Sequence, residues 1–166
     1  MATERGVRLR PVAEEDRFRI RRWLSEPEVQ KWWGSAAAAE AAITLALESS
    51  HALPRVVERD GRPIGYAHAV EAAILGERPS PHMPAGSWLV DFFTGVAEHR
   101  GQDVEAAALV LLTAEVFATT LAVACCGIAS IRNEAGVRAY ERAGFRWLRI
   151  WPDRVLGPCW LMEKAR

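Results

Sequence analysis

The sequence predicts an α/β (α+β) fold with a single mixed central β-sheet and helices on both faces. Apolar and charged residues alternate in a first short segment, two apolar segments flank an Asp-Gly turn, and strands alternate with helices in the second half of the chain. With 166 residues, the chain is long enough for one sizeable core. No repeat or low-complexity linker divides it. We therefore expect residues 1–166 to form one domain.

The N-terminal third predicts one strand followed by helices. Residues 7–12 (VRLRPV) alternate between apolar and charged side chains, as a half-buried strand does. Residues 14–24 follow as a helix with its apolar members mostly on one side. The segment SEP at 25–27 combines a capping residue with a proline near the first turn, which predicts a short second helix. A further helix is expected over 36–47.

The middle of the chain predicts a hairpin and a long strand. Residues 53–70 form the hairpin, with Asp60-Gly61 as its turn. Residues 75–86 contain three prolines and two glycines, which is typical of an irregular exposed loop. The strongly apolar segment 87–95 follows as a strand.

The last third alternates helices and strands. We expect a helix over 104–119, a buried strand over 120–130, and a second helix over 133–143 that a glycine closes. Two final strands are expected at 145–151 and 159–162, on either side of the turn WPDRVLGP.

Composition excludes several functions. Lys+Arg and Asp+Glu both number 21, and this balance argues against broad electrostatic capture of nucleic acid. No segment approaches the roughly 18 consecutive apolar residues of a membrane span, and the N-terminus has no apolar stretch of signal-peptide length. Cys125, Cys126 and Cys159 show no metal-ligand spacing. We expect a cytoplasmic protein with reduced, partly buried thiols, and with no metal, nucleic acid or membrane partner.

Three features together resemble the GNAT acetyltransferase superfamily. They are the strand, turn and helix around EHRGQDVEA (98–106), the segment NEAGVRAYERAGF (133–145), and the order of the elements. Two further segments, WLSEPEVQKWWG (23–34) and DGRPIGYAHA (60–69), are similar to those of the aminoglycoside 6'-N-acetyltransferase group. The resemblance covers nearly the whole chain. It implies transfer of an acetyl group from acetyl-CoA, as co-substrate, to a primary amine of a small molecule.

The resemblance also implies a coenzyme A loop at 100–106. In the family, an R-G-x-G-x-G/A turn wraps the pyrophosphate with backbone N–H groups. Here Asp103 and Glu105 stand where glycine or alanine is expected. Such acids satisfy the free N–H groups of an unliganded helix start and complement its dipole, whereas acids that point outward leave the backbone contacts of a cofactor loop intact. The implied cofactor-binding residues are Phe93, Thr94, Gly95, Arg100, Gly101, Gln102, Asp103, Val104, Glu105, Ala106 and Asn133.

Two side chains are implied to be catalytic. Asp91 is a lone carboxylate in the apolar strand SWLVDFFTGV, where a charge is costly unless it is paired or lies at a cleft. It matches an aspartate that holds and deprotonates the substrate amine. The alternative is an aspartate that faces outward or pairs with an arginine. Tyr140 matches a tyrosine that protonates the leaving thiolate, a role that suits its high pKa. Its alternative is a core aromatic residue.

The acceptor side shows one departure from the group. Trp32, Trp33 and Tyr66 match its aromatic segments near the acceptor pocket, with core packing as the alternative. Ile128 stands where the group has one of the carboxylates that line this pocket. Two other functions therefore stay open. One is a catalytically impaired GNAT-fold binding protein with a degenerate coenzyme A loop; the other is an acetyltransferase for a siderophore-type or protein N-terminal amine.

Overall fold

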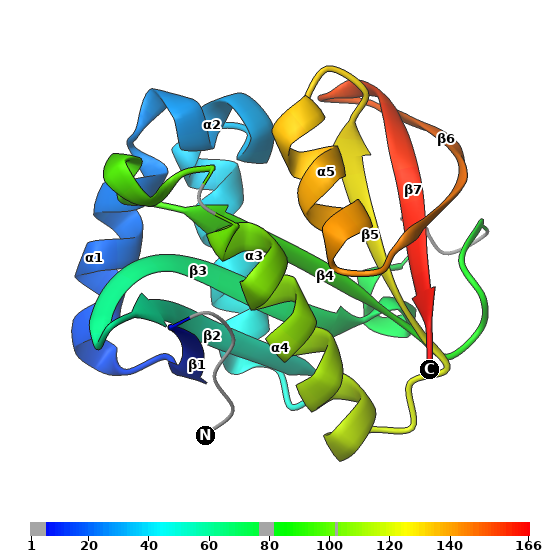
Figure 1. Cartoon of the computed structure of the whole chain (residues 1–166), viewed down its shortest axis with the longest axis horizontal. Coiled ribbons are helices and arrows are strands. Elements are labelled where there is room, and N and C mark those ends of the chain that lie inside the picture. The colour runs from blue at the N-terminus through cyan, green and yellow to red at the C-terminus, as the bar shows by residue number, and fades with distance from the viewer. Residues whose placement is uncertain (1–5, 77–81, 102) are drawn as a thin grey trace.

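The computed structural model describes residues 6–76, 82–101 and 103–166. Its strands form one seven-stranded sheet in the order β1-β2-β3-β4-β5-β7-β6 (Figure 1). Within the described ranges, β4 and β5 pair in parallel and the other neighbours pair antiparallel, so the sheet is mixed. The strands are β1 (Val7–Pro11), β2 (Ala52–Arg59), β3 (Arg62–Glu71), β4 (Ser87–Thr94), β5 (Ala124–Ser130), β6 (Arg146–Asp153) and β7 (Gly157–Ala165).

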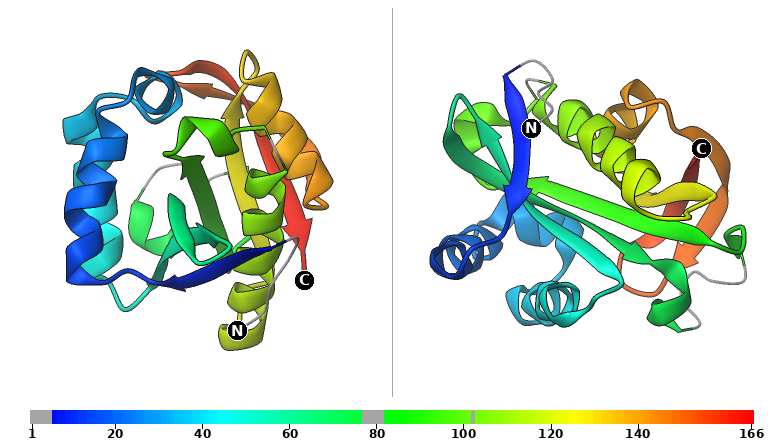
Figure 2. Two further views of the ribbon diagram at one scale, coloured as in Figure 1. Left: turned by 60° about the vertical axis from the view of Figure 1, so that its left-hand side comes forward. Right: turned by 90° about the horizontal axis from the view of Figure 1, so that it is seen from below.

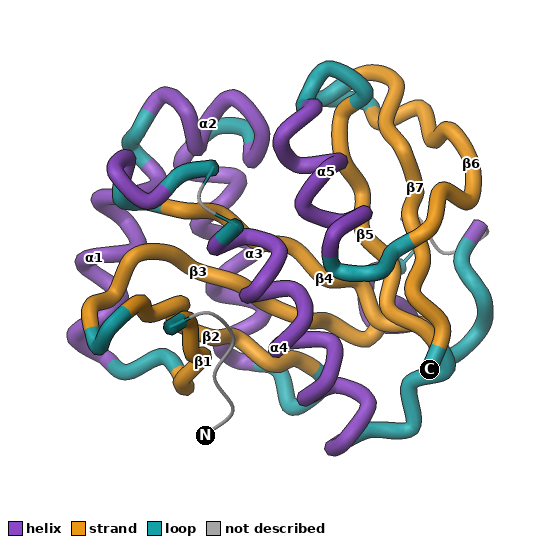
Figure 3. The backbone as a smooth tube through the Cα atoms, viewed as in Figure 1, coloured by secondary structure: helices purple, strands orange, loops and turns teal. Residues whose placement is uncertain are grey.

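Helices cover both faces of this sheet, as predicted. The N-terminal helices α1 and α3 lie against β3 and β2, whereas on the other face of the sheet α4 lies against β1, β3 and β4, and α5 lies against β5 (Figure 2, left). Figure 3 shows the strands as a layer between these two groups of helices. The helices are α1 (Glu14–Leu24), α2 (Pro27–Trp33), α3 (Ala36–Glu48), α4 (Val104–Thr119) and α5 (Glu134–Arg142), with short 3-10 turns η1 (Ala72–Leu75) and η3 (Ala97–His99).

Two segments differ from the sequence prediction. The strand expected over 120–130 begins at Ala124, and the Leu121 side chain before it is 96% exposed. A turn forms there because the Thr120 hydroxyl accepts a hydrogen bond from the Ala122 N–H at 3.0 Å. In the segment expected to be an exposed loop, Met83 is instead buried in an apolar cluster of the core. Residues 77–81 of that loop lie outside the described part of the chain.

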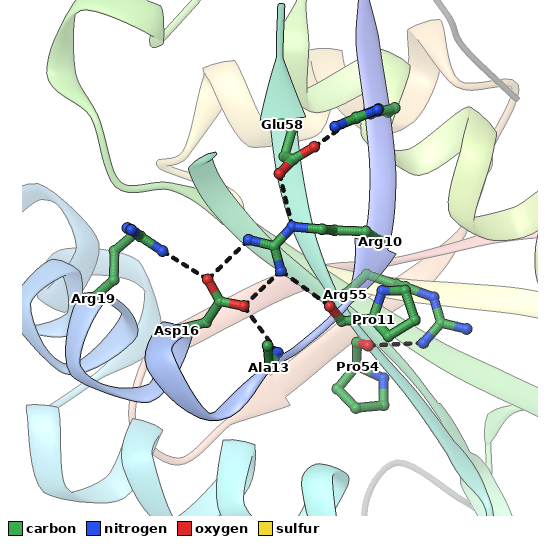
Figure 4. Close-up of polar contacts among 9 residues, drawn as sticks. Arg10, Pro11, Ala13, Asp16, Arg19, Pro54, Arg55 and Glu58 are labelled. Atoms are coloured by element: carbon green, nitrogen blue, oxygen red, sulfur yellow. Dashed lines mark hydrogen bonds and ion pairs between the residues drawn. The ribbon is translucent and has the colours of Figure 1, made fainter. Parts of the chain in front are cut away.

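A charge network joins β1, α1 and β2 (Figure 4). The fully buried carboxylate of Asp16 accepts hydrogen bonds from Arg10 at 2.5 and 2.9 Å and from the Ala13 N–H at 2.9 Å. Arg10 also donates to Glu58 at 2.7 Å. The hydrogen bond from Arg10 outweighs burial and holds the pKa of Asp16 below its ordinary value. For Glu58, burial is the largest influence, but Arg10 and Arg8 together still lower its pKa.

The sheet opens between β4 and β5. Their parallel pairing covers Ser87–Leu89 and Ala124–Cys126. On its other side, β4 stays paired with β3 as far as Thr94. The two halves of the sheet therefore separate after Leu89, and the remaining edge of β4 faces the opening.

Candidate active site

A cavity of about 560 Å³ lies at this opening. Its lining comes from α2, β4, the start of α4, β5, α5 and the turn between β6 and β7. Side chains alternate between the two faces of a strand, so Leu89 and Asp91 lie on the α2 side of β4, while Val90 and Phe92 lie on the α4 and α5 side. All four line the cavity. The cavity therefore reaches both faces of the sheet through the gap between β4 and β5.

Asp91 lies in the middle of the exposed edge of β4. Its side chain is largely buried, and its Oδ1 accepts a hydrogen bond from the Phe92 N–H at 2.8 Å. Burial raises the pKa of Asp91 to about 7, with the hydrogen bond acting in the opposite direction. Within the described residues, the carboxylate forms no ion pair with an arginine. Asp91 thus lies at a cleft. With a pKa of about 7, its carboxyl group is partly protonated and partly ionised near neutral pH.

Tyr140 bridges the opening from α5. Its ring lies directly over Gly127 of β5, where an added Cβ would come within 2.1 Å of the ring. Its hydroxyl crosses to β4 and donates a hydrogen bond to the Val90 carbonyl at 2.9 Å. Phe92 and Phe145 pack against the ring edge, and burial raises the pKa of Tyr140 well above 10. Tyr140 is therefore a packed core residue whose protonated hydroxyl lies at the cavity.

Side chains also donate hydrogen bonds to other backbone carbonyls along the exposed edge of β4. The Phe92 carbonyl accepts a hydrogen bond from Trp33 Nε1 at 2.9 Å. The Thr94 carbonyl accepts one from Arg100 Nε at 3.1 Å. With the Val90 carbonyl already bonded, alternate carbonyls along this edge have partners without a neighbouring strand. These contacts hold β4 as an edge strand beside the cavity.

Two residues of the segment before α4 have a backbone conformation that glycine adopts readily. Gly101 and Asp103 have φ values of 72° and 61°, both in the left-handed region. The prediction that the acids cap this helix is wrong for Asp103, which forms no side-chain cap hydrogen bond. A capping residue needs extended backbone, and the left-handed conformation does not supply it. Asp103 instead pairs with Arg142 of α5, and the Glu105 carboxylate accepts a hydrogen bond from the Thr94 hydroxyl at 2.6 Å.

This end of the cavity fits an anionic group. Asp103 forms no side-chain cap on the first N–H groups of α4, and these groups lie at the positive end of the helix dipole. Open space surrounds the Cα of Gly101, where no atom would lie within 4 Å of an added Cβ. Arg100, Arg138 and Arg142 line the same cavity, and Arg142 pairs with Asp103 at the start of α4. Gln102 lies outside the described residues.

Asn133 and the start of α5 complete this region. The Asn133 side chain accepts a hydrogen bond from the Gly136 N–H at 3.0 Å and so caps α5. Asn133 and Ala106 both line the cavity. The capping expected from the sequence is therefore present, and it holds Asn133 at the cavity wall.

Three predicted site residues lie behind the cavity wall rather than in it. Tyr66 is fully buried, and its hydroxyl is bonded to His68 at 3.1 Å, so it forms core packing beneath Trp33. Gly95 lies against the Trp23 ring, which an added Cβ would approach to 2.2 Å. Val104 is buried in the main core. The remaining described residues predicted for the site, Trp32, Trp33, Asp91, Phe93, Thr94, Arg100, Gly101, Asp103, Glu105, Ala106, Asn133 and Tyr140, all line the cavity.

The sequence reasoning missed two acids of the cavity wall. Glu28 lines the cavity from α2, one helical turn before Trp32. Asp153 lines it from the end of β6, where its Oδ1 accepts hydrogen bonds from the N–H groups of Val155 and Leu156, both at 2.8 Å. Ile128 does lie on the cavity wall. The spacing of Glu28 and Trp32 on one helix face was the available signal, whereas nothing local indicated what the turn at Asp153 faces.

The described ranges contain neither a cluster of metal-binding side chains nor a membrane-spanning helix. Within residues 6–76, 82–101 and 103–166, no three His, Cys, Asp or Glu side chains lie together as a metal site would require. In these same ranges, no helix has the length and apolar character to cross a membrane. The three cysteines are free, and they are fully rather than partly buried, which raises the pKa of each thiol.

The chain was compared with known proteins by sequence and by structure. No curated protein matches it by sequence. Aminoglycoside acetyltransferase AAC(6')-Ib, solved with ribostamycin and coenzyme A, aligns over 97% of this chain and 94% of its own, with 22% identity and a TM-score of 0.84. Aminoglycoside N(6')-acetyltransferase from Legionella pneumophila aligns over 98% and 93%, with 16% identity and a TM-score of 0.77. Spermidine N-acetyltransferase from Vibrio cholerae, solved with coenzyme A and spermine, aligns over 98% and 96%, with 15% identity and a TM-score of 0.75.

The three structures share the fold of this chain. A model of the family described as the acetyltransferase (GNAT) domain matches residues 12–151, which is most of the chain. This chain therefore belongs to the GNAT acetyltransferase family.

Proposed function

We propose that this protein transfers the acetyl group of acetyl-CoA to a primary amine of a small cationic molecule. The observation that carries the proposal is Asp91, a largely buried carboxylate with a raised pKa at the gap between β4 and β5. Family membership supports the reaction type. Similar structures hold coenzyme A together with ribostamycin or spermine, both of which are amines.

The α4 and α5 side of the cavity would hold the cofactor. The start of α4, where Asp103 forms no side-chain cap, the open space at Gly101 and the Arg142 guanidinium suit phosphate. The exposed edge of β4 has the strand geometry that suits the amide groups of an extended arm. An arm that bonds to the Val90 or Phe92 carbonyl would have to replace the hydrogen bond from Tyr140 or Trp33. When bound there, acetyl-CoA supplies an activated acyl thioester.

Asp91 would act on the acceptor. An ammonium ion is attracted by the ionised carboxylate, and the carboxylate then takes a proton from the nitrogen, which frees the lone pair for attack. A pKa of about 7 suits this role, since Asp91 is substantially ionised at neutral pH and yet basic enough to accept the proton. Glu28 and Asp153 would hold a second positive charge of the acceptor, because both line the cavity.

Tyr140 would donate a proton to the departing sulfur. Burial keeps its phenol protonated, which suits a donor and excludes a resting phenolate. Its proton is engaged by the Val90 carbonyl at 2.9 Å. The hydroxyl therefore has to rotate away from that carbonyl before it can donate.

The acceptor wall favours an amine on an aliphatic chain. Leu89, Ile128 and Leu156 line the cavity together with the acids. Apolar side chains suit methylene groups, whereas the hydroxyl groups of an aminosugar would lose hydrogen bonds to water there. We therefore expect di- and polyamines to be better acceptors than aminoglycosides, with siderophore-type and peptide N-terminal amines as the further classes to test.

Calorimetry with coenzyme A, followed by an acceptor screen with acetyl-CoA, tests the proposal. We expect micromolar to submillimolar binding, acetylation of at least one polyamine, and loss of turnover in Asp91→Asn. Ile128→Asp is the matched acceptor variant and should shift preference toward aminoglycosides. Absence of binding at millimolar coenzyme A would contradict the proposal.

A binding protein without catalysis is the second candidate, because Asp103 pairs with a cavity arginine at the expected phosphate site. Tight coenzyme A binding with no turnover of any amine would favour that candidate. Turnover of one acceptor that is lost in Asp91→Asn would eliminate it.

A further inference from the structure

An ion pair spans the cofactor side of the cavity. Arg142, at the end of α5, pairs through Nη1 with Oδ1 of Asp103, at the start of α4. Both residues line the cavity, and their side chains are 59% and 34% exposed. The pair thus lies at the helix start that suits a phosphate.

The charge of Asp103 is not needed for the shape of the loop. Its left-handed φ of 61° is one that glycine or asparagine adopts at least as readily. Its carboxylate does not cap α4 either. What the acid adds beyond glycine or asparagine at this position is therefore a negative charge that contacts Arg142.

The other two arginines of this region have different surroundings. The Arg100 guanidinium donates to the Thr94 and Gly95 carbonyls at 3.1 and 3.2 Å, so it is held against the backbone. Arg138 lies one turn before Arg142 on α5 and pairs loosely with Glu134 at 3.7 Å. Among these three side chains, Arg142 is the one whose recorded partner belongs to the phosphate loop itself.

We propose that Arg142 binds the pyrophosphate of coenzyme A and that Asp103 is its internal counter-ion, which the pyrophosphate must displace. The inference rests on the proposed function. A guanidinium binds phosphate through two parallel hydrogen bonds, as it binds a carboxylate, so the two anions compete for the same group. The Asp103 carboxylate therefore reduces the affinity of Arg142 for phosphate. Asp103 sets how much cofactor is needed to load the site.

A double-mutant cycle followed by calorimetry tests this competition, with coenzyme A as the probe. Asp103→Asn should tighten binding about 5- to 20-fold, because it removes both the competitor and its repulsion of phosphate. Arg142→Gln should weaken binding. In the Arg142→Gln background, Asp103→Asn should tighten binding less than about threefold. The same gain in both backgrounds would overturn the proposal, because Asp103 would then act by general repulsion.

Arg138→Gln is the matched control, since Arg138 lies on the same helix and lines the same cavity without contacting Asp103 in the described contacts. In that background the full gain from Asp103→Asn should persist, and its loss would contradict a specific pairing with Arg142. Dephospho-coenzyme A, which lacks the 3'-phosphate, should show the same gain; if the gain disappears, the pyrophosphate assignment is wrong.

The outcomes also separate this inference from the proposed function. If no variant binds coenzyme A, the proposed function fails. If the variants bind but show no coupling between Asp103 and Arg142, only the present inference fails.

Discussion

Replacing Asp91 by asparagine is expected to make the protein more stable and less active. The substitution keeps the side-chain size and leaves an oxygen to accept the Phe92 N–H. It removes the ionisable group whose pKa burial raises from 3.8 to about 7. The wild-type protein must ionise this group at a site that disfavours the charge, whereas the variant never carries the charge. Stability and activity should therefore change in opposite directions.

The size and the pH range of the effect follow from linkage. Below about pH 4, Asp91 is protonated in both the folded and the unfolded chain, so its ionisation does not affect stability. Between about 4 and 7 the unfolded chain loses the proton first, so the stability of the wild-type protein falls as pH rises. Above 7 the cost is complete. One pKa unit corresponds to about 1.4 kcal/mol. The rise from 3.8 to about 7 therefore lowers the free energy of unfolding by at most about 4 kcal/mol.

Urea unfolding at pH 4.5 and at pH 8.5 measures this effect. The variant should be more stable than wild type by about 2 to 4 kcal/mol at pH 8.5 and by less than about 1 kcal/mol at pH 4.5. Asp60→Asn, in the exposed hairpin turn, is the control, with a change below about 0.5 kcal/mol at both values. Turnover should fall by about 10²- to 10⁴-fold. An equal gain at both pH values, or a loss at pH 8.5, would refute the reasoning.

Three further substitutions test the packing of Tyr140 and the buried ion pair of Asp16. Tyr140→Phe removes the hydroxyl that donates to the Val90 carbonyl. The free energy of unfolding in urea should fall by about 1 kcal/mol, and kcat should fall more than the affinity for coenzyme A. An unchanged kcat would mean that Tyr140 takes no part in the reaction. Gly127→Ala places a Cβ 2.1 Å from the Tyr140 ring and should destabilise by more than about 2 kcal/mol, so a change below about 0.5 kcal/mol would mean that the ring is not held there. Asp16→Asn breaks a buried pair with Arg10 and should cost about 3 kcal/mol at pH 7. The difference in stability should shrink as pH falls through the lowered pKa of Asp16, because a carboxyl group with a lowered pKa stabilises the fold only while it is ionised. A loss of stability that is independent of pH would contradict this.

The loop at 100–106 shows what sequence reasoning can miss at a single position. An acid at the start of a helix is most simply a cap, and Asp103 and Glu105 both fit that pattern. The structure gives Asp103 a left-handed backbone and a partner 39 residues away. The residue type alone indicates neither of these features. The turn as a whole sets the backbone conformation of Asp103, and the packing of α4 against α5 sets its contact with Arg142.

The acceptor side shows the same limit in another form. The sequence showed Ile128 at a position where the aminoglycoside group has one of the carboxylates of its acceptor pocket. Glu28 and Asp153 restore negative charge from α2 and from the end of β6. Tyr66, which matched an aromatic segment of the pocket, is instead core packing behind Trp33.

The sequence by itself determined most of the elements and their order, because strand alternation, helix periodicity and turn residues are local signals that survive without knowledge of the fold. It indicated the family through the resemblance of four segments, 23–34, 60–69, 98–106 and 133–145. It also indicated Asp91 and Tyr140. Only the tertiary structure decided their environment. The strands β4 and β5 separate after Leu89, Asp91 lies largely buried beside that gap, and the Tyr140 hydroxyl reaches the Val90 carbonyl. Proton affinity and charge pairing depend on which side chains meet across the sheet, and those neighbours are far apart in the chain.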